Sequence, residues 1–247
     1  MKKSIIMAAA LLVATASCRT DSGEGQGAPS AQDLTISDDP MVLTDCDIVF
    51  DGVRFNKAVN GGDSLVEIKD SVLEFDCSEG RDLFNDPNIK LSNHSVPAIM
   101  TEIDNTKPFT FSAKVNPGFS ADGTYNAAEL LVFANDTLYQ KLCFEQDERG
   151  NHRVVSVRTE GTSDDSNHDI VTDESVYLKI SSDTRTIASY YSTDGLEWRM
   201  VRLYRNNYPS NLLVGIASQA PKSGNCLSQF SDLKLEKNNV SDFRMGE

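Results

Sequence analysis

Ala127-Ala-Glu-Leu-Leu-Val-Phe133 and Thr137-Leu-Tyr-Gln-Lys-Leu-Cys-Phe-Glu145 are two short runs rich in Leu, Val, Phe and Tyr, separated by Asn135-Asp136. Apolar runs of this length, with aromatic and β-branched residues, are typical of buried strands rather than of helices. Asn135-Asp136 suits a two-residue hairpin turn, because both residue types tolerate positive φ angles. The segment therefore predicts a pair of antiparallel strands.

Runs of the same kind continue on both sides of this pair, and helical periodicity is nearly absent. Two further turns are predicted at 147–151 and 193–195, where Gly150 and Gly195 are free to take positive φ. Successive hairpins bury their faces best as two packed antiparallel sheets, and no repeat of fixed period suggests a propeller. The strands that we expect lie at 47–50, 64–68, 71–77, 109–115, 127–133, 137–145, 153–159, 175–181, 186–192, 197–204, 212–218 and 226–236.

The first residues have the parts of an export signal. Lys2 and Lys3 are followed by an apolar stretch at 5–14, which is too short to span a bilayer. Small residues then precede Cys18, as in the lipobox of bacterial lipoproteins. We expect residues 1–17 to be removed and Cys18 to be lipidated; the alternative is an ordinary secretory signal with an incidental cysteine.

The segment that follows Cys18 is rich in Gly, Ser, Pro and Asp, so residues 18–40 are expected to form a flexible tether. Two acyl chains on one cysteine anchor a protein stably, and the lipid would be its only attachment to the membrane. Arg19, rather than Asp, follows the cysteine, and this favours an outer-membrane lipoprotein of the cell envelope. Residues 41–236 then form one domain, with a C-terminal tail at 237–247.

The chain of 247 residues has a formal net charge of −14. Removal of the signal, which contains two lysines and no acidic residue, leaves 21 basic and 37 acidic residues. This balance repels phosphate backbones and anionic lipid, so it argues against nucleic-acid binding and against a basic membrane-docking patch.

Four cysteines remain besides Cys18, namely Cys46, Cys77, Cys143 and Cys226. In an oxidising compartment they allow three disulfide pairings, and four buried thiols are the alternative. Neither they nor His94, His152 and His168 show the spacing of a zinc site, and we expect the histidines at the surface.

Several segments, in this order, resemble one known family. They are Arg81–Pro87, Phe109–Val115, Ala127–Phe133, Tyr191–Trp198 and Val214–Pro221. Together they are similar to the DUF1349 family, which is grouped with the concanavalin A-like superfamily, and the similarity covers about residues 64–236. This resemblance implies an all-β, concanavalin A-like jelly-roll β-sandwich of two antiparallel sheets. It implies little about activity, because the activity of the family is largely unassigned.

The resemblance also suggests where catalytic acids would lie. Some glycosidases of the superfamily carry three acids spaced E-x-D-x-x-E on one strand, and retaining chemistry needs two carboxyls about 5 Å apart. Glu145 and Asp147 match the first two positions, but Gly150 stands at the third. Glu129 is a further candidate, since the family often has glycine there. We expect these acids at a solvated hairpin end, and catalysis is the alternative.

Ser163-Asp-Asp-Ser-Asn-His-Asp169 is the densest polar segment. We expect an Asx-rich loop whose side chains cap their own backbone. The alternative is a site for calcium or sugar hydroxyls that uses Asp164, Asp165 and Asn167, because a hard cation takes several oxygen ligands from one loop. No other cofactor is expected.

Aromatic and arginine side chains cluster between 186 and 208. Trp198 is the only tryptophan, and we expect it in the core, with sugar stacking as the alternative. Tyr190 is expected to be exposed, and Arg202 could donate hydrogen bonds to sugar hydroxyls.

These features favour a non-catalytic carbohydrate-binding module on a lipid-anchored protein, with a glycan as its partner. Two alternatives stay open: a polysaccharide-acting glycoside hydrolase, and a structural or protein-interaction lipoprotein.

Overall fold

The computed structural model describes residues 40–247. The expected signal peptide, the Cys18 lipidation site and nearly all of the expected tether lie outside these residues. Within them, no helix is long and apolar enough to cross a membrane.

The described part of the chain forms seventeen strands and one short 3₁₀ turn, Gly62–Ser64. The strands are β1 (Thr44–Phe50), β2 (Val53–Val59), β3 (Val66–Lys69), β4 (Val72–Cys77), β5 (Leu83–Asn85), β6 (Ser92–His94), β7 (Ala98–Asp104), β8 (Phe109–Asn116), β9 (Ala127–Asn135), β10 (Leu138–Gln146), β11 (His152–Glu160), β12 (Thr162–Ile170), β13 (Val176–Ser182), β14 (Thr186–Ser192), β15 (Arg199–Arg205), β16 (Asn211–Gln219) and β17 (Cys226–Glu236).

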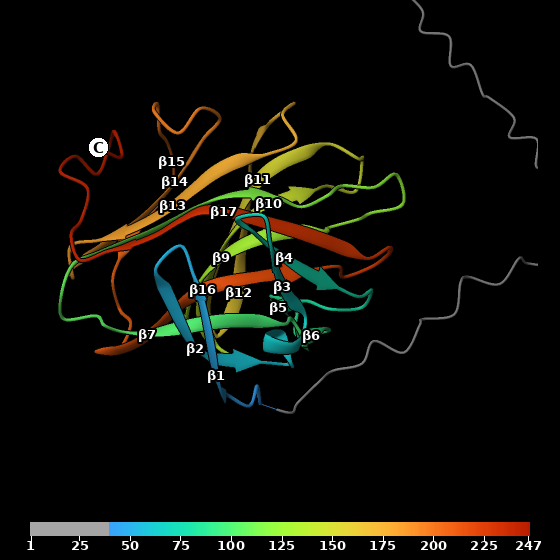
Figure 1. Ribbon diagram of the computed structural model, residues 1–247, viewed down its shortest axis with the longest axis horizontal. Coiled ribbons are helices and arrows are strands. Elements are labelled where there is room, and N and C mark those ends of the chain that lie inside the picture. The colour runs from blue at the N-terminus through green and yellow to red at the C-terminus, as the bar shows by residue number, and fades with distance from the viewer. Residues whose placement is uncertain (1–39) are drawn as a thin grey trace, which may run out of the picture. The chain divides into compact units, whose positions relative to one another are not determined.

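Two large antiparallel sheets pack against each other (Figure 1). The eight-stranded sheet has the order β1-β2-β7-β16-β9-β10-β11-β12, and the seven-stranded sheet has the order β15-β14-β13-β8-β17-β4-β3. β5 and β6 form a separate small hairpin. The predicted jelly-roll β-sandwich of two antiparallel sheets is therefore confirmed.

The core lies between the two sheets and follows from strand alternation. In β9, Ala128, Leu130 and Val132 face the seven-stranded sheet and join Phe111 and Phe230 in the main core cluster. The alternate residues of β9 point away from this core, and most of them are buried as well. Since β9 is buried on both faces, another layer must cover the outer face of its sheet.

The predicted turns are largely confirmed. Gly150 and Gly195 both have a φ of 76°. The turn between β9 and β10 lies one residue later than predicted, at Asp136-Thr137, and the Thr137 amide donates to Asn135 Oδ1 at 3.0 Å.

The polar loop predicted at 163–169 is wrong, because this segment is the edge strand β12. Consecutive residues of a strand point to opposite faces of the sheet. Asp164 and Asp165 therefore cannot converge on one ion, as they could in a loop. β2, β5, β6 and β7 are further strands that the sequence pattern did not predict.

The C-terminal segment after β17 folds back onto the outside of the seven-stranded sheet. Val240 and Phe243 pack there against Tyr190, whose hydroxyl donates to the Phe243 carbonyl at 2.8 Å. Lys179 Nζ donates to the carbonyl of Gly246 at 2.9 Å. The predicted tail at 237–247 is thus part of the folded structure.

Candidate functional site

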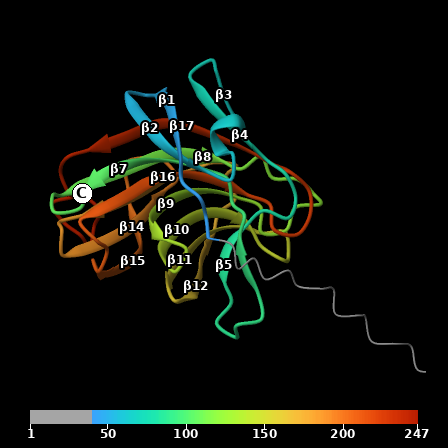
Figure 2. The same ribbon diagram turned by 90° about the horizontal axis from the view of Figure 1, so that it is seen from below.

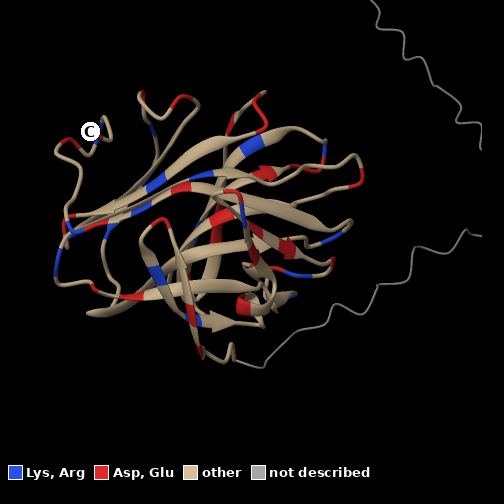
Figure 3. Cartoon of the chain, in the orientation of Figure 1, with Lys and Arg blue, Asp and Glu red and all other residues tan. Residues whose placement is uncertain are grey.

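The outer face of the eight-stranded sheet, which points away from the main core, carries an unusual mixture of charged and apolar side chains. Strand alternation places Glu129 of β9 and Lys141 and Glu145 of β10 on this face. Asp165 and Asn167 of β12 lie on it too, opposite Val157 and Val155 of β11. Elsewhere, acidic and basic residues are spread over the strands and loops of both sheets (Figure 3).

The β5–β6 hairpin and its flanking residues cover part of this outer face (Figure 2). Leu83 and Val96 pack with Leu131 and Phe133 in a second apolar cluster. Phe84 packs against a third cluster, formed by Ala127, Cys143, Val155 and Val157.

Asn85 ties the hairpin to β12 and to the turns beside it. Its backbone amide donates to Ser163 Oγ at 2.9 Å. Its side-chain amide donates to the carbonyl oxygens of Asp136 at 2.8 Å and Gly161 at 3.1 Å. The hairpin is therefore a fixed layer of the domain, held by both apolar and polar contacts.

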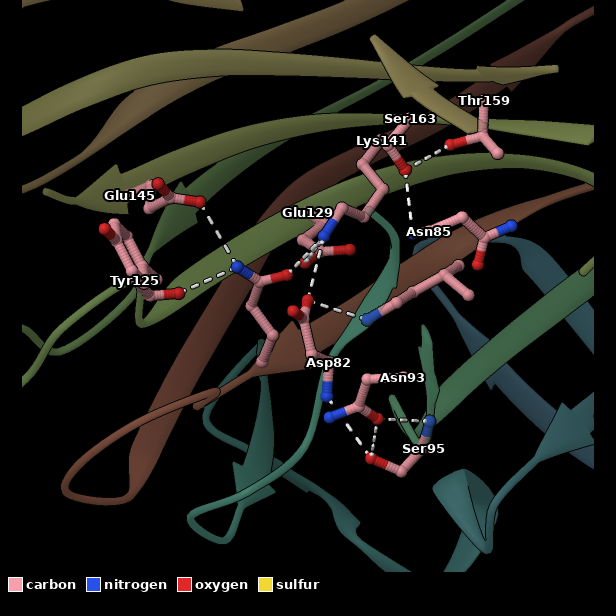
Figure 4. Close-up of polar contacts among 12 residues, drawn as sticks. Asp82, Asn85, Asn93, Ser95, Tyr125, Glu129, Lys141, Glu145, Thr159 and Ser163 are labelled. Carbon is pink, nitrogen blue, oxygen red and sulfur yellow. Dashed lines mark hydrogen bonds and ion pairs between the residues drawn. The ribbon is translucent and has the colours of Figure 1, made fainter. Parts of the chain in front are cut away.

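Beneath this layer, Lys141 lies among carboxylates (Figure 4). Its ammonium donates to Asp82 Oδ1 at 3.1 Å and to Gln219 Oε1 at 2.7 Å, and Glu129 Oε1 lies 3.9 Å away. Burial disfavours the ammonium, but Asp82 and Glu129 outweigh this and raise the pKa of Lys141 well above its ordinary value. Lys141 is therefore charged and holds Asp82 against the sheet.

Glu129 is fully buried, and neither of its carboxyl oxygens has a hydrogen-bond partner. Burial raises its pKa to about 7, although the neighbouring Lys141 opposes the shift. A buried carboxyl without partners is costly when ionised, so Glu129 holds a proton up to near-neutral pH.

Glu145 and Asp147 differ from the prediction of a solvated hairpin end, since they are only 8% and 3% exposed. Glu145 accepts a hydrogen bond from Gln219 Nε2 at 3.2 Å, and burial raises its pKa well above the ordinary value. Asp147 instead stabilises its own turn. It accepts hydrogen bonds from the Asn151 amide at 2.8 Å and Arg153 Nε at 3.0 Å. Burial opposes ionisation of Asp147, yet these bonds, with Asn151 first, lower its pKa to about 2.

Tyr125 lies at the end of this face, and sequence reasoning missed it. Its φ is 63°, a left-handed conformation that is rare for a bulky residue. The Tyr125 amide donates to the Gln146 carbonyl at 2.7 Å, and its carbonyl accepts from Gln219 Nε2 at 2.7 Å. Burial and the carboxylates of Glu148 and Glu145 raise the pKa of its phenol. Strained backbone of this kind is concentrated at functional sites.

Asp164 and Asp165, the two candidate aspartates of the predicted polar segment, point to opposite faces of β12. Asp165 and Asn167 are exposed and flank the apolar cluster under Phe84. Asp164, on the opposite face of β12, accepts a hydrogen bond from Arg202 at 3.0 Å. Within residues 40–247, no three His, Cys, Asp or Glu side chains are grouped so that they could hold a metal ion.

The expected exposure of Tyr190 is wrong, because this side chain is fully buried under the C-terminal segment. Trp198 is half-buried in the same place, on the outside of the seven-stranded sheet rather than in the main core, and Lys179 Nζ lies 3.5 Å from its ring centroid. Arg202 bridges the edges of the two sheets, since its Nε donates to Ser156 Oγ at 2.9 Å. None of the three lies near the outer face that carries Glu129 and Glu145.

The three histidines, which we expected at the surface, are each partly exposed and partly buried. His152 stacks on Phe119, with 3.8 Å between the ring centroids. His94 hydrogen-bonds Asn85 Oδ1 at 2.6 Å, within the hairpin layer.

Comparison with known proteins agrees with the fold. A family model described as "Protein of unknown function (DUF1349)" matches residues 60–238. No curated protein matches the chain. Among solved structures, one described as a functionally unknown protein from Saccharomyces cerevisiae is similar, with a TM-score of 0.64 and 21% identity over 71% of this chain and 92% of that chain.

Larger proteins contain the same fold as a part. The GH43 BlXynB protein from Bacillus licheniformis is similar with a TM-score of 0.58 and 16% identity, over 78% of this chain and 38% of that chain. The structure described as Bacteroides ovatus Xyloglucan PUL GH43B has a TM-score of 0.55 and 15% identity, over 79% of this chain and 38% of that chain. At these identities the similarity establishes the sandwich fold alone.

Proposed function

Because the chain belongs to the DUF1349 family of proteins of unknown function, its role has to be argued from its own side chains, and we propose that it is a non-catalytic carbohydrate-binding domain. Its ligand would bind on the outer face of the eight-stranded sheet, beside the β5–β6 hairpin. The observation that carries the proposal is the group of solvent-reachable polar and aromatic side chains there: Phe84, Tyr125, Asp165 and Asn167.

The chemistry of this group suits a sugar. The hydroxyls of a pyranose donate hydrogen bonds to carboxylate oxygens and both donate to and accept from an amide, which Asp165 and Asn167 supply. Its axial C–H bonds pack on an aromatic ring, and Phe84 and Tyr125 supply two rings. Because β-sheet strands hold Asp165 and Asn167 on one side, these groups are positioned before a ligand arrives.

The strain at Tyr125 supports the same location. Two hydrogen bonds to the backbone of this residue hold it in the left-handed region, at the end of the face where Glu145 lies. A fold that needed only a turn there would be better served by glycine or asparagine. Tyrosine at this position places an aromatic ring at the end of this face, where Lys222 Nζ lies 4.8 Å from the ring centroid.

The state of Glu129, Glu145 and Asp147, the three candidate acids, argues for binding without hydrolysis. Retaining and inverting glycosidases need one carboxyl that is ionised and one that is protonated. Burial favours the protonated form of both Glu129 and Glu145, and Glu129 lies under the Asp82–Lys141 pair without access to solvent. Asp147 is ionised but is held in its own turn.

The neighbours suggest which glycans to test first. The matched structures include a protein described as xylan beta-1,4-xylosidase from Bacillus Halodurans, with a TM-score of 0.53, besides the xyloglucan-related GH43 protein. The chain spans less than two fifths of each, so the activity of those proteins does not carry over. Xylan and xyloglucan are nevertheless reasonable first ligands for this domain.

The sequence of the first eighteen residues suggests where in the cell this function is carried out. We propose that Cys18 carries the lipid and that the domain is presented to glycan at the cell envelope. Mass spectrometry of the protein from its native host tests this part, since an unmodified Cys18 would exclude it.

Binding is tested by affinity electrophoresis in gels that contain xylan or xyloglucan, together with a glycan array. We expect retention of the wild type, and loss of at least tenfold in affinity for the Asp165→Ala and Asn167→Ala variants. Asp164→Ala is the matched control, because Asp164 lies on the other face of the same strand.

Each contrary outcome has a clear meaning. No retention on any polysaccharide would remove the proposal, and a stable protein that co-purifies from the host would then favour the protein-interaction alternative. Release of reducing sugar by the wild type, absent in Glu145→Gln, would show a hydrolase instead.

A further inference from the structure

Two cysteines face each other at one end of the seven-stranded sheet. Cys77, the last residue of β4, is the direct antiparallel partner of Cys226, the first residue of β17. Both side chains point toward the core, since Cys77 is two residues from Phe75 and Cys226 four residues from Phe230, and both phenylalanines belong to it. Both are fully buried, and together with Ala220 they form a small cluster of their own.

The structure separates the other two cysteines from this pair and from each other. Cys46 lies on β1 and Cys143 on β10, with four strands of the eight-stranded sheet between them. Strands are spaced by about 4.8 Å, so these two are on the order of 24 Å apart. Cys143 also points to the outer face of that sheet, away from the core. Of the three pairings open from the sequence, only one contains cysteines that are adjacent in space.

We propose that Cys77 and Cys226 form a disulfide in the mature protein, and that Cys46 and Cys143 remain thiols. Directly opposed residues of an antiparallel pair have Cα atoms about 4.5 to 5.5 Å apart, which lies within the range that a disulfide spans. In the reduced form, Cys226 Sγ lies 3.2 Å from the Pro117 carbonyl oxygen and Cys77 Sγ lies 3.6 Å from that of Ser78. Rotation of both side chains toward each other is the change that the bond requires.

The chemistry is thiol–disulfide exchange with a disulfide oxidant, such as oxidised glutathione. The thiolate of one cysteine attacks the oxidant and forms a mixed disulfide, releasing one reduced glutathione. The second thiolate then attacks the mixed disulfide and releases the second one. The two cysteines lose two electrons and two protons, and the oxidant is reduced to two thiols.

Burial of the two thiols determines at which stage of folding the disulfide forms. Exchange needs a thiolate, and burial raises the pKa of both the Cys77 and Cys226 thiols. The folded, reduced protein is therefore slow to react, and the bond forms while the chain folds in an oxidising compartment.

The disulfide would also fix the start of the hairpin layer. Only three residues separate Cys77 from Arg81, which forms a bridge with Ala220, and Asp82 follows directly. The Gly80 amide donates to the Ala220 carbonyl at 2.7 Å in the same connection. A bond at Cys77 would thus hold the segment from which Asp82 reaches Lys141.

The test refolds the full chain from reductant and denaturant in a glutathione redox buffer. Free thiols are then alkylated under denaturing conditions, and the peptides are mapped by mass spectrometry. We expect a Cys77–Cys226 disulfide peptide and alkylated Cys46 and Cys143. Four alkylated thiols at these positions in the folded product would overturn the proposal, as would a disulfide that includes Cys46 or Cys143.

Thermal unfolding provides a second measurement. A bond that closes so long a loop should raise Tm by on the order of 10 °C over the same protein in reductant. Cys77→Ala, Cys226→Ala and the double variant should each lose this dependence on reductant, while Cys143→Ala, the matched control, should keep it. A wild type whose Tm is the same with and without reductant would contradict the disulfide.

Discussion

The Lys141 ammonium of β10 lies 3.1 Å from the Asp82 carboxylate, which belongs to the connection that leads into the β5–β6 hairpin. The pair joins the outer face of the eight-stranded sheet to the layer that covers it, and the Lys141 side chain is only 3% exposed. Glu129 lies on the other side of the same ammonium. One cation therefore serves two carboxyls in a place from which water is largely excluded.

Removal of this cation should be costly. Lys141→Met leaves Asp82 and Glu129 without their partner, and breaking a buried ion pair by removal of one member costs roughly 3 to 5 kcal/mol. We expect the urea midpoint to fall accordingly, with an unchanged m value. A second change, Glu129→Gln, made together with Lys141→Met, should recover part of the loss because it removes one uncompensated carboxyl.

The control for this experiment is Lys57→Met. Lys57 pairs with Asp45 at the edge of the same sheet, but Asp45 is 87% exposed. Little change in stability is expected there, since exposed ion pairs contribute little. Equal losses of stability in Lys141→Met and Lys57→Met would show that burial does not increase the contribution of the Lys141 pair to stability.

The Glu129 carboxyl predicts a particular pH dependence. Its pKa rises from the ordinary value of 4.5 to about 7 in the folded protein. Between these values the unfolded chain binds fewer protons than the folded one, so stability falls as pH rises. The contribution is complete below pH 4.5 and is lost as pH passes through about 7. It amounts to on the order of 3 kcal/mol.

Urea denaturation at pH values from 4.5 to 8 measures this contribution. In Glu129→Gln the decline should be smaller, because the amide does not titrate. Glu145→Gln should act in the same direction, since burial raises that pKa as well. A Glu129→Gln profile that runs parallel to that of the wild type would refute the assignment.

The fold was predictable from sequence because its central strands are buried on both faces. Apolar runs such as 127–133 and 109–115 leave few alternatives to a strand, and their turns contain the residues that turns need. β12 was missed for the opposite physical reason. It is an edge strand with one neighbour, and its sequence Thr-Ser-Asp-Asp-Ser-Asn-His-Asp-Ile has no apolar face to give a signal.

The site was predictable only in part. Glu145 was found because it matches the first position of the E-x-D-x-x-E spacing, and Glu129 because it stands where the family often has glycine. Lys141 lies in the same predicted strand as Glu145 but matches no such motif, and its partner Asp82 is 59 residues away in the sequence. The Lys141–Asp82 pair forms only because the β5–β6 hairpin covers the outer face of the sheet. No local sequence pattern predicts that hairpin. Tyr190 was misplaced because nothing in the sequence showed that the C-terminal segment would cover it.

Substitution of Tyr125 should weaken glycan binding while leaving stability nearly unchanged. In Tyr125→Gly the loss of ring packing is offset by relief of the left-handed strain, which costs about 1 to 2 kcal/mol for a residue with a side chain. We expect the free energy of unfolding to change by less than about 1 kcal/mol. Affinity for a bound glycan should fall at least tenfold, because one stacking surface is lost.

The measurements are urea denaturation and affinity electrophoresis on the same preparation. Tyr125→Phe is the matched variant, since it keeps the ring and removes the hydroxyl. It should bind nearly as well as the wild type if stacking is what matters. Unchanged binding in Tyr125→Gly would place the glycan elsewhere.

Arg202 should contribute to stability and not to glycan binding, which is the reverse of what we expect for Tyr125. It donates to Ser156 Oγ at 2.9 Å and to Asp164 Oδ2 at 3.0 Å, and it thereby links β15 of one sheet to β11 and β12 of the other. Arg202→Ala removes these bonds at a cost of about 1 to 2 kcal/mol. Glycan affinity should stay within twofold of the wild type, because the outer face keeps its geometry. Calorimetry and affinity electrophoresis measure the two effects separately. A large loss of binding with unchanged stability would return the ligand site to the strands between 186 and 208, where the sequence alone had placed it.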